Sequence, residues 1–205
     1  MEIFGQLFLN SLQISAAYIL FSLGLTLIFG VMKVVNFAHG EFFGLVLLLI
    51  AVLVPWLNNP SVPLVVAYGA AGAVSILATM ACGWFLYHFA FKKFQRDMVG
   101  SFVLSVGLSL LIQGLFLEFF GGIPIKLPDL IEGNLRILGG AITTQRLVLT
   151  LIALLVAVTM CWLIAATKLG KSLRAVAEDH EAAMLQGIPY RKTALYGFLI
   201  ATFLA

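Results

Sequence analysis

Charged residues are scarce in this chain, and their scarcity excludes a soluble fold. Asp, Glu, Lys and Arg make up 10% of the 205 residues, against 62% hydrophobic residues and a mean hydropathy of +1.09. A soluble domain carries about 25% charged residues. In a bilayer, backbone polar groups need internal partners, so spanning segments are helices or closed barrels. The apolar runs are long and lack the alternation of barrel strands, which predicts an all-α, polytopic bundle of transmembrane helices.

Cysteines and catalytic motifs are also few. Cys82 and Cys161 both fall in predicted spans without metal-ligand or redox spacing, so free thiols are expected. The G-K-S tripeptide at 170–172 resembles the end of a phosphate-binding loop, but Ala165 replaces its first glycine and no strand precedes it. H-E-x-x-H and G-x-S-x-G sets are absent. We therefore expect no catalytic residue, no cofactor and no metal. We also expect no nucleic-acid binding, because the positive charges lie at the ends of apolar segments.

Apolar runs divide the chain into about five predicted spans and the start of a sixth. A span needs roughly 20 residues to cross a core of about 30 Å. The second run has only about 15 residues, near 22 Å, so it extends back through the His39 region, tilts little or is re-entrant. The last run, from Thr193 to Ala205, is too short to cross, so we expect a single transmembrane domain over 1–205 that is truncated at its C-terminus. The predicted spans are 7–32, 42–56, 64–91, 99–120 and 147–167.

Two predicted spans carry polar residues three or four positions apart, so each set shares one helix face. Such stripes usually hydrogen-bond to neighbouring helices, for about 1 kcal/mol or less each. The alternative is that they line a polar path. The candidate pathway residues are Ser11, Ser15 and Ser22 on the first span, and Ser105, Ser109 and Gln113 on the fourth.

A polar interruption separates the first two spans. The string Asn-Phe-Ala-His-Gly-Glu places Asn36, His39, Gly40 and Glu41 between apolar runs. Ionisable groups beside a membrane segment mark a water-facing loop or a functional break. Metal binding is disfavoured, because His39 and Glu41 are only two positions apart and no third ligand is evident. We expect a cytoplasmic turn that caps and orients the next helix.

The longest polar stretch, 168–192, follows the fifth span. Its periodicity predicts an amphipathic helix from about Lys171 to Gln186. Gly187 followed by Pro189 ends this helix, because glycine suits the left-handed position after a helix and proline cannot continue one. The apolar face would hold Leu173, Val176, Ala177, His180 and Met184, and the polar face Arg174, Glu178 and Glu181.

Two motifs in these polar stretches resemble a known family. Glu181-Ala182-Ala183, three residues and then Gly187 is similar to the E-A-A-x-x-x-G signature of ABC importer permeases. The string at 36–41 is similar to the N-F-A-H-G-(E/D) signature of the branched-chain amino-acid permeases. The I-x-L-P that continues the longer form of the first signature is absent after Gly187, which fits the looser version found in the branched-chain group.

The resemblance implies a permease subunit of an ATP-driven importer in the bacterial inner membrane, carrying branched-chain amino acids. Its partners would be two ATPase subunits, a second homologous permease subunit and a periplasmic substrate-binding protein. The stretch 168–192 would hold a coupling helix that docks on an ATPase subunit. The sequence does not distinguish this chain from related permeases that carry urea and short amides. The implied coupling residues are Arg174, Glu178, Glu181, Ala182, Ala183 and Gly187, and the signature-loop residues are Asn36, His39, Gly40 and Glu41.

Basic residues predict the orientation. One cluster, Lys92, Lys93 and Arg96, precedes the fourth span; the other follows the fifth, and two crossings separate them. Both clusters belong in the cytoplasm, which places Lys33 inside and the N-terminus outside if the second run spans. The segment 121–145 would then be an outer loop, in which Lys126 and Arg136 balance Asp129 and Glu132.

An ion-coupled secondary transporter is the main alternative. It needs intramembrane acidic or basic coupling groups, and only Glu118, Glu41 and His39 are available. The amphipathic helix would have no role in that mechanism. A membrane enzyme or assembly scaffold is a third possibility, disfavoured by the missing catalytic motifs.

Overall fold

The computed structural model describes residues 2–59, 61–95, 97–122, 125, 127–131, 133–137 and 139–205. The expected all-α membrane bundle is confirmed, because five helices are long and apolar enough to cross a membrane. They are α1 (Glu2–Met32), α2 (His39–Leu57), α3 (Leu64–Phe89), α4 (Met98–Phe120) and α5 (Thr144–Ala166). The other elements are η1 (Phe91–Phe94), β1 (Asn134–Ile137), β2 (Gly140–Thr143), α6 (Lys168–Glu178), α7 (His180–Leu185) and α8 (Tyr190–Leu204).

A short β-hairpin occupies part of the segment 121–145, where the sequence predicted only a loop. Strands β1 and β2 pair antiparallel, with Asn134 opposite Thr143 and Ile137 opposite Gly140. Gly139 has a φ of +79° in the turn, a conformation that glycine adopts at no steric cost. The hairpin is fixed to the start of α1, because the Ala141 N–H donates to Gln6 Oε1 at 2.8 Å. Of the charged residues used above, Arg96, Lys126 and Glu132 lie outside the described residues.

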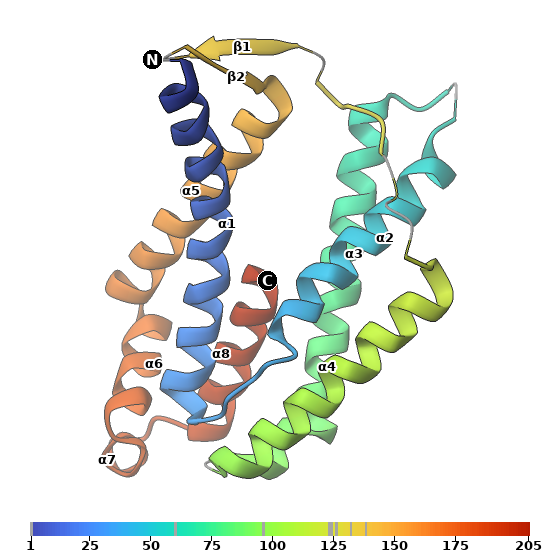
Figure 1. Cartoon of the computed structure of the whole chain (residues 1–205). Helices are drawn as coiled ribbons and strands as arrows, with labels where there is room; N and C mark the ends of the chain where they lie inside the picture. Colours follow the sequence, from blue (N-terminus) through green and yellow to red (C-terminus); the bar gives the residue numbers. More distant parts are fainter. Residues whose placement is uncertain are drawn as a thin grey trace.

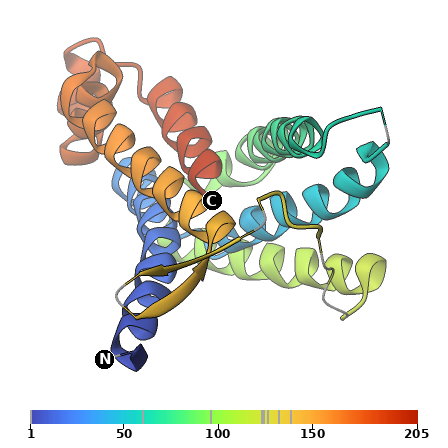
Figure 2. The same cartoon turned by 90° about the horizontal axis from the view of Figure 1, so that it is seen from above.

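Helix α8 lies between two groups of helices. Figures 1 and 2 show α1, α5 and α6 on one side of it and α2, α3 and α4 on the other. Phe198 of α8 is fully buried, with ring centroids 5.7 Å from Tyr87, 5.3 Å from Phe91 and 6.4 Å from Phe42. Small residues let the backbones approach: a Cβ at Gly83 of α3 would lie 2.7 Å from Thr202 Oγ1. The core of the bundle therefore forms around α8.

The two basic clusters lie at the same end of the molecule. η1, which carries Lys92 and Lys93, leads into the start of α4, and that start lies at the lower end in Figure 1 together with α6 and α7. The hairpin and the start of α1 lie at the opposite end. This placement agrees with two crossings between the clusters; the side of the membrane on which they lie stays a prediction from charge.

The second span begins at His39 and is preceded by a chain segment that turns back into the bundle. Of the alternatives for this run, the helix does extend back to His39, which gives it 19 residues and about 28 Å. The segment from Lys33 to Ala38 runs from the lower end of α1 back toward the middle of the molecule (Figure 1). It starts at Lys33 with a φ of +55°, so the chain leaves α1 through a left-handed residue.

The close contact between α3 and α8 gives the first prediction. We expect Gly83→Ala to destabilise the protein by roughly 1–3 kcal/mol, because the added Cβ overlaps Thr202 and the helices must separate. Gly69→Ala on the same helix is the matched control, since a Cβ there meets nothing within 4 Å. The control should be neutral or more stable by up to about 1 kcal/mol. Thermal unfolding of both variants in detergent, followed by tryptophan fluorescence, measures the difference; equal midpoints would contradict the packing argument.

Candidate functional site

The polar stretch 168–192 is attached to α5 by a tight turn. Thr167 caps α6, its Oγ1 accepting from the Gly170 N–H at 3.1 Å. A Cβ at Gly170 would lie 2.3 Å from the carbonyl oxygen of Ile164, so only glycine fits this turn. Arg174 Nη2 donates to the carbonyl oxygen of Ala165 at 3.1 Å, and a cation there complements the end of α5. These contacts fix the direction of α6 relative to α5.

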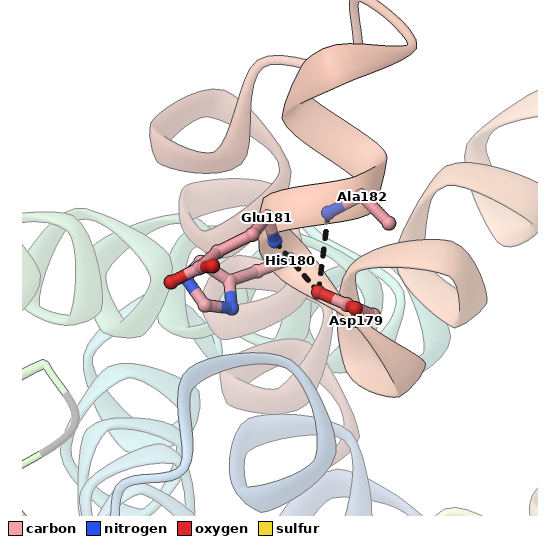
Figure 3. A network of polar contacts seen from close by, with 4 residues as sticks. All are labelled: Asp179, His180, Glu181 and Ala182. Carbon is pink, nitrogen blue, oxygen red and sulfur yellow. Dashed lines mark hydrogen bonds and ion pairs between the residues drawn. The ribbon is translucent and has the colours of Figure 1, made fainter.

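The single helix expected from Lys171 to Gln186 is wrong, because the chain breaks at Asp179. This residue has an extended backbone, with φ −147° and ψ 107°, between α6 and α7. Its Oδ1 accepts hydrogen bonds from the N–H groups of Glu181, at 2.9 Å, and Ala182, at 3.1 Å (Figure 3). Aspartate is a preferred N-cap, so it stops one helix and starts the next.

The break changes which side chains of α7 are buried. Leu173 and Val176 of α6 are buried as expected, but Met184 is 48% exposed and Leu185 is 90% exposed. Ala183 is the residue of α7 that is buried instead. The expected apolar face is therefore wrong at Met184, because periodicity counted through Asp179 assumes a continuous helix. Two apolar side chains are exposed at the tip of a polar segment.

Gly187 ends α7 as the sequence predicts. Its φ is +81°, its N–H donates to the Met184 carbonyl at 3.0 Å, and the Ile188 N–H donates to the Ala183 carbonyl at 3.0 Å. This pair of bonds is the Schellman motif, which needs a left-handed residue that is usually glycine. The turn then leads through Pro189 into α8.

A groove lies between α6 and α7 on this polar segment. Its volume is about 310 Å³, and the side chains of Glu178, Arg174 and Glu181 are exposed around the bend. Glu181 Oε1 lies 3.7 Å from His180 Nε2. Of the implied coupling residues, Glu178, Ala182 and Ala183 line the groove, with Ala182 exposed and Ala183 buried. The groove is lined by Ala175, Glu178, Asp179, Ala182, Ala183, Gln186 and Ile188.

Two of the four signature-loop residues, Asn36 and His39, are buried inside the bundle, whereas a cytoplasmic turn was expected, and Gly40 and Glu41 are half-buried. Asn36 is 1% exposed and His39 is fully buried. Neither the Asn36 amide nor the ring nitrogens of His39 make a hydrogen bond of standard geometry to the described residues. The His39 ring lies 5.0 Å from the ring of Phe21 and directly against Gly24, whose Cβ, if present, would lie 2.6 Å from Nε2. Gly40 lies beside Phe21 as well, since a Cβ at Gly40 would lie 3.7 Å from the Phe21 ring.

Glu41 connects the signature loop to the polar stripe on α4. Its Oε1 accepts from Ser109 Oγ at 2.7 Å and from Gln113 Nε2 at 2.6 Å. Gln113 Nε2 also donates to Ser109 Oγ at 3.1 Å. Ser105 is buried, and its hydroxyl donates to the Phe102 carbonyl of its own helix at 2.9 Å.

The stripe on α1 does not join this cluster. Ser11, Ser15 and Ser22 are exposed on the surface of the chain, and Ser22 Oγ donates to the carbonyl of Ile19 in its own helix, at 3.4 Å. The structure thus brings three of the candidate pathway and loop residues together, Glu41, Ser109 and Gln113, and leaves the α1 residues apart.

Sequence reasoning missed three residues that shape these sites. Asp179 was readable as an N-cap, since it precedes the Glu-Ala-Ala string, but the surrounding periodicity suggested a continuous helix. The exposure of Leu185 could be predicted only from its position outside the apolar face of the expected helix. Gly24 gave no signal, because its contact with His39 joins positions far apart in the chain.

Comparison with known proteins shows which family this chain resembles. The family model described as branched-chain amino acid transport system / permease component matches residues 7–205. BraD of Pseudomonas aeruginosa, a high-affinity branched-chain amino acid transport system permease protein, is 27% identical over 98% of this chain and 67% of its own length. LivH of Salmonella typhimurium and LivH of Escherichia coli K12, permease proteins of the same description, are each 26% identical over 98% of this chain and 68% of their own length.

The chain spans about two thirds of the length of these relatives. No solved structure matches it. The family match nevertheless covers almost all of the chain, including the signature loop and the α6–α7 segment. The chain therefore belongs to the family of branched-chain amino acid transport system permease components.

Proposed function

We propose that this chain is the translocation subunit of an ATP-driven importer of branched-chain amino acids in the bacterial inner membrane. It would work with two ATPase subunits, a second homologous permease subunit and a periplasmic substrate-binding protein. The observation that carries the proposal is the α6–α7 segment, a polar bend with an exposed apolar tip at one end of a membrane bundle of this family. Lipid does not favour the exposed charges of Glu178 and Glu181, and water does not favour the exposed Leu185. A protein partner accommodates both.

The segment is built to transmit force from such a partner. Leu173 of α6 packs 3.3 Å from the position where a Cβ of Gly197 would lie, and Val31 of α1 lies 3.6 Å from the same point. One buried contact thus joins α6, α8 and α1. Closure of the ATPase pair against α7 would push α6 as a rigid body. The packed core would pass that shift to α1 and α8 and change access to the pathway.

Substrate selection would rest mainly with the soluble binding protein, so this subunit needs no tight site. The α4 stripe with Glu41 is the part of the candidate pathway in which polar groups of two helices meet. The α1 stripe would face the second permease subunit or the pathway, since hydroxyl groups exposed to lipid lack partners.

Association with the ATPase gives the second prediction. Glu181→Lys reverses an exposed charge at the bend, and Gly187→Trp puts a bulky L-residue at a φ of +81°, at a cost of roughly 1–2 kcal/mol. In a pull-down of the full-length protein from membranes, we expect the nucleotide-binding subunit to co-purify with wild type and to be lost with either variant.

Two controls make this pull-down specific. Asp129→Lys places the same charge reversal on the exposed loop at the other end of the molecule and should retain the ATPase. Gly187→Asn introduces a side chain that tolerates the left-handed conformation, and should retain it too. If no ATPase associates with wild type, and uptake survives ATP depletion but stops when the proton gradient collapses, the chain is an ion-coupled transporter and the proposal is wrong.

The N-cap of α7 gives the third prediction. Asp179→Ala removes the acceptor for two backbone N–H groups and should destabilise α7 by about 1 kcal/mol. Asp179→Asn keeps an acceptor oxygen and is the control. Hydrogen exchange at the amides of Glu181 and Ala182 should be about fivefold faster in the alanine variant, and ATP-driven uptake should fall in parallel. Unchanged exchange would mean that α7 does not depend on this cap.

A further inference from the structure

Glu41 lies within the bundle at a depth where carboxylates are rare. Its neighbour Gly40 lies beside the ring of Phe21, a residue of α1 that is 11 positions before Met32. At 1.5 Å per residue, α2 therefore begins about 16 Å inside the lower end of α1. Ionisable residues at such depth are costly and mark functional sites by default.

The Glu41 carboxylate has no cationic partner within the described part of the chain. The one ion pair found there within 4.0 Å joins His180 and Glu181. Both hydrogen bonds that Glu41 receives go to Oε1, from Ser109 and Gln113. Oε2 receives none from the described residues, and the side chain is partly exposed. The carboxylate is oriented by one oxygen while the other is available.

The hydrogen bonds that connect Glu41 to α4 do not by themselves require a charge. A glutamine at this position would offer one carbonyl oxygen to the same two donors and would connect α2 to α4 without placing a charge in the membrane. The donors Ser109 and Gln113 are neutral and need no anion to satisfy them. The charge complements the N-terminus of α2, because Glu41 lies in its first turn, and it remains available to a cationic group that the described residues do not supply.

The surroundings fit a zwitterion. The N-terminus of α2 has no capping side chain and carries a positive partial charge. The buried amide of Asn36, which precedes Glu41 in the chain, makes no hydrogen bond to the described residues. Interrupted membrane helices bind anionic substrate groups at such N-termini. An α-amino acid presents a carboxylate for the helix end and an ammonium group for Glu41, whereas urea and neutral amides present no cation.

We infer that Glu41 is the substrate-contact residue that receives the α-ammonium group of the translocated amino acid through Oε2. Ser109 and Gln113 are positioning residues that orient the carboxylate. The inference rests on the proposed function and deepens it, because it names the residue that would contact the ammonium group of the amino acid.

The test measures leucine uptake and ATP hydrolysis together, in proteoliposomes that contain the full-length permease pair, its ATPase subunits and the binding protein. Glu41→Gln keeps an acceptor for Ser109 and Gln113 but removes the charge. We expect leucine transported per ATP hydrolysed to fall by about tenfold or more, as for loss of a hydrogen bond to a charged group, with ATP hydrolysis within about twofold of wild type.

Three further variants separate a substrate contact from a structural role. Glu41→Asp keeps the charge and should retain more transport than Glu41→Gln. Ser109→Ala removes one positioning bond and should cost a few-fold in transport, roughly the effect of one hydrogen bond. Glu118→Gln makes the same chemical change at an exposed site on α4 and should leave the transport ratio unchanged.

Each result decides the inference. Transport per ATP in Glu41→Gln equal to wild type would overturn it. Parallel loss of transport and ATP hydrolysis in both Glu41→Gln and Glu41→Asp would also overturn it and assign Glu41 to helix packing alone. If wild type itself shows no ATP-driven uptake of leucine, it is the proposed function that fails. This outcome is distinguishable because it is measured on wild type alone, without any variant.

Discussion

The close approach of three chain segments at Gly24 is the constraint on which the rest of this structure depends. A Cβ at this position would lie 2.6 Å from His39 Nε2 and 3.2 Å from the carbonyl oxygen of Ala201. Without a side chain there, the segment before α2 can fold back into the bundle and α8 can pack beside it. Non-helical backbone is tolerated at membrane depth only where protein covers it or water reaches it. Here protein covers it: Val34 and Ala38 are fully buried.

The segment that returns into the bundle, from Lys33 to Ala38, makes a backbone hydrogen bond to α4. This contact explains why the signature loop and the polar stripe of α4 lie together. The Val35 N–H donates to Ser101 Oγ at 3.4 Å, and Ser101 lies four positions before Ser105, on the same face of α4 that supplies Ser109 to Glu41. Helix α4 packs mainly on α2 and η1 and is otherwise exposed on this chain. Its polar face therefore contributes to the attachment of α4 to the bundle, together with Leu104 and Leu108, which pack against the core.

Local patterns in the sequence predicted the structure correctly where the residues of one element determine it. Length and hydropathy predicted the spans, and Gly187 with Pro189 predicted a left-handed helix end, because these signals lie within a few residues. They failed where a single residue ends a helix within a stretch of helical periodicity, as Asp179 does between α6 and α7. The hairpin near Gly139 was missed because two four-residue strands in a glycine-rich segment carry no periodic signal. The depth of His39 was missed because it is set by Gly24, a distant position whose only property is the lack of a side chain.

These contacts form a continuous physical connection between the two proposed sites. The polar bend is anchored through Leu173, which packs with Val31 of α1 at Gly197 of α8. Seven positions before Val31, the same helix carries Gly24, against which His39 lies two residues before Glu41. A displacement of α6 that rotates or shifts α1 must move Gly24 relative to His39, and a contact this close cannot absorb the movement by rotamer changes alone. The glycine that allows the loop to enter the bundle is thus also the point at which force on the coupling segment would reach the carboxylate.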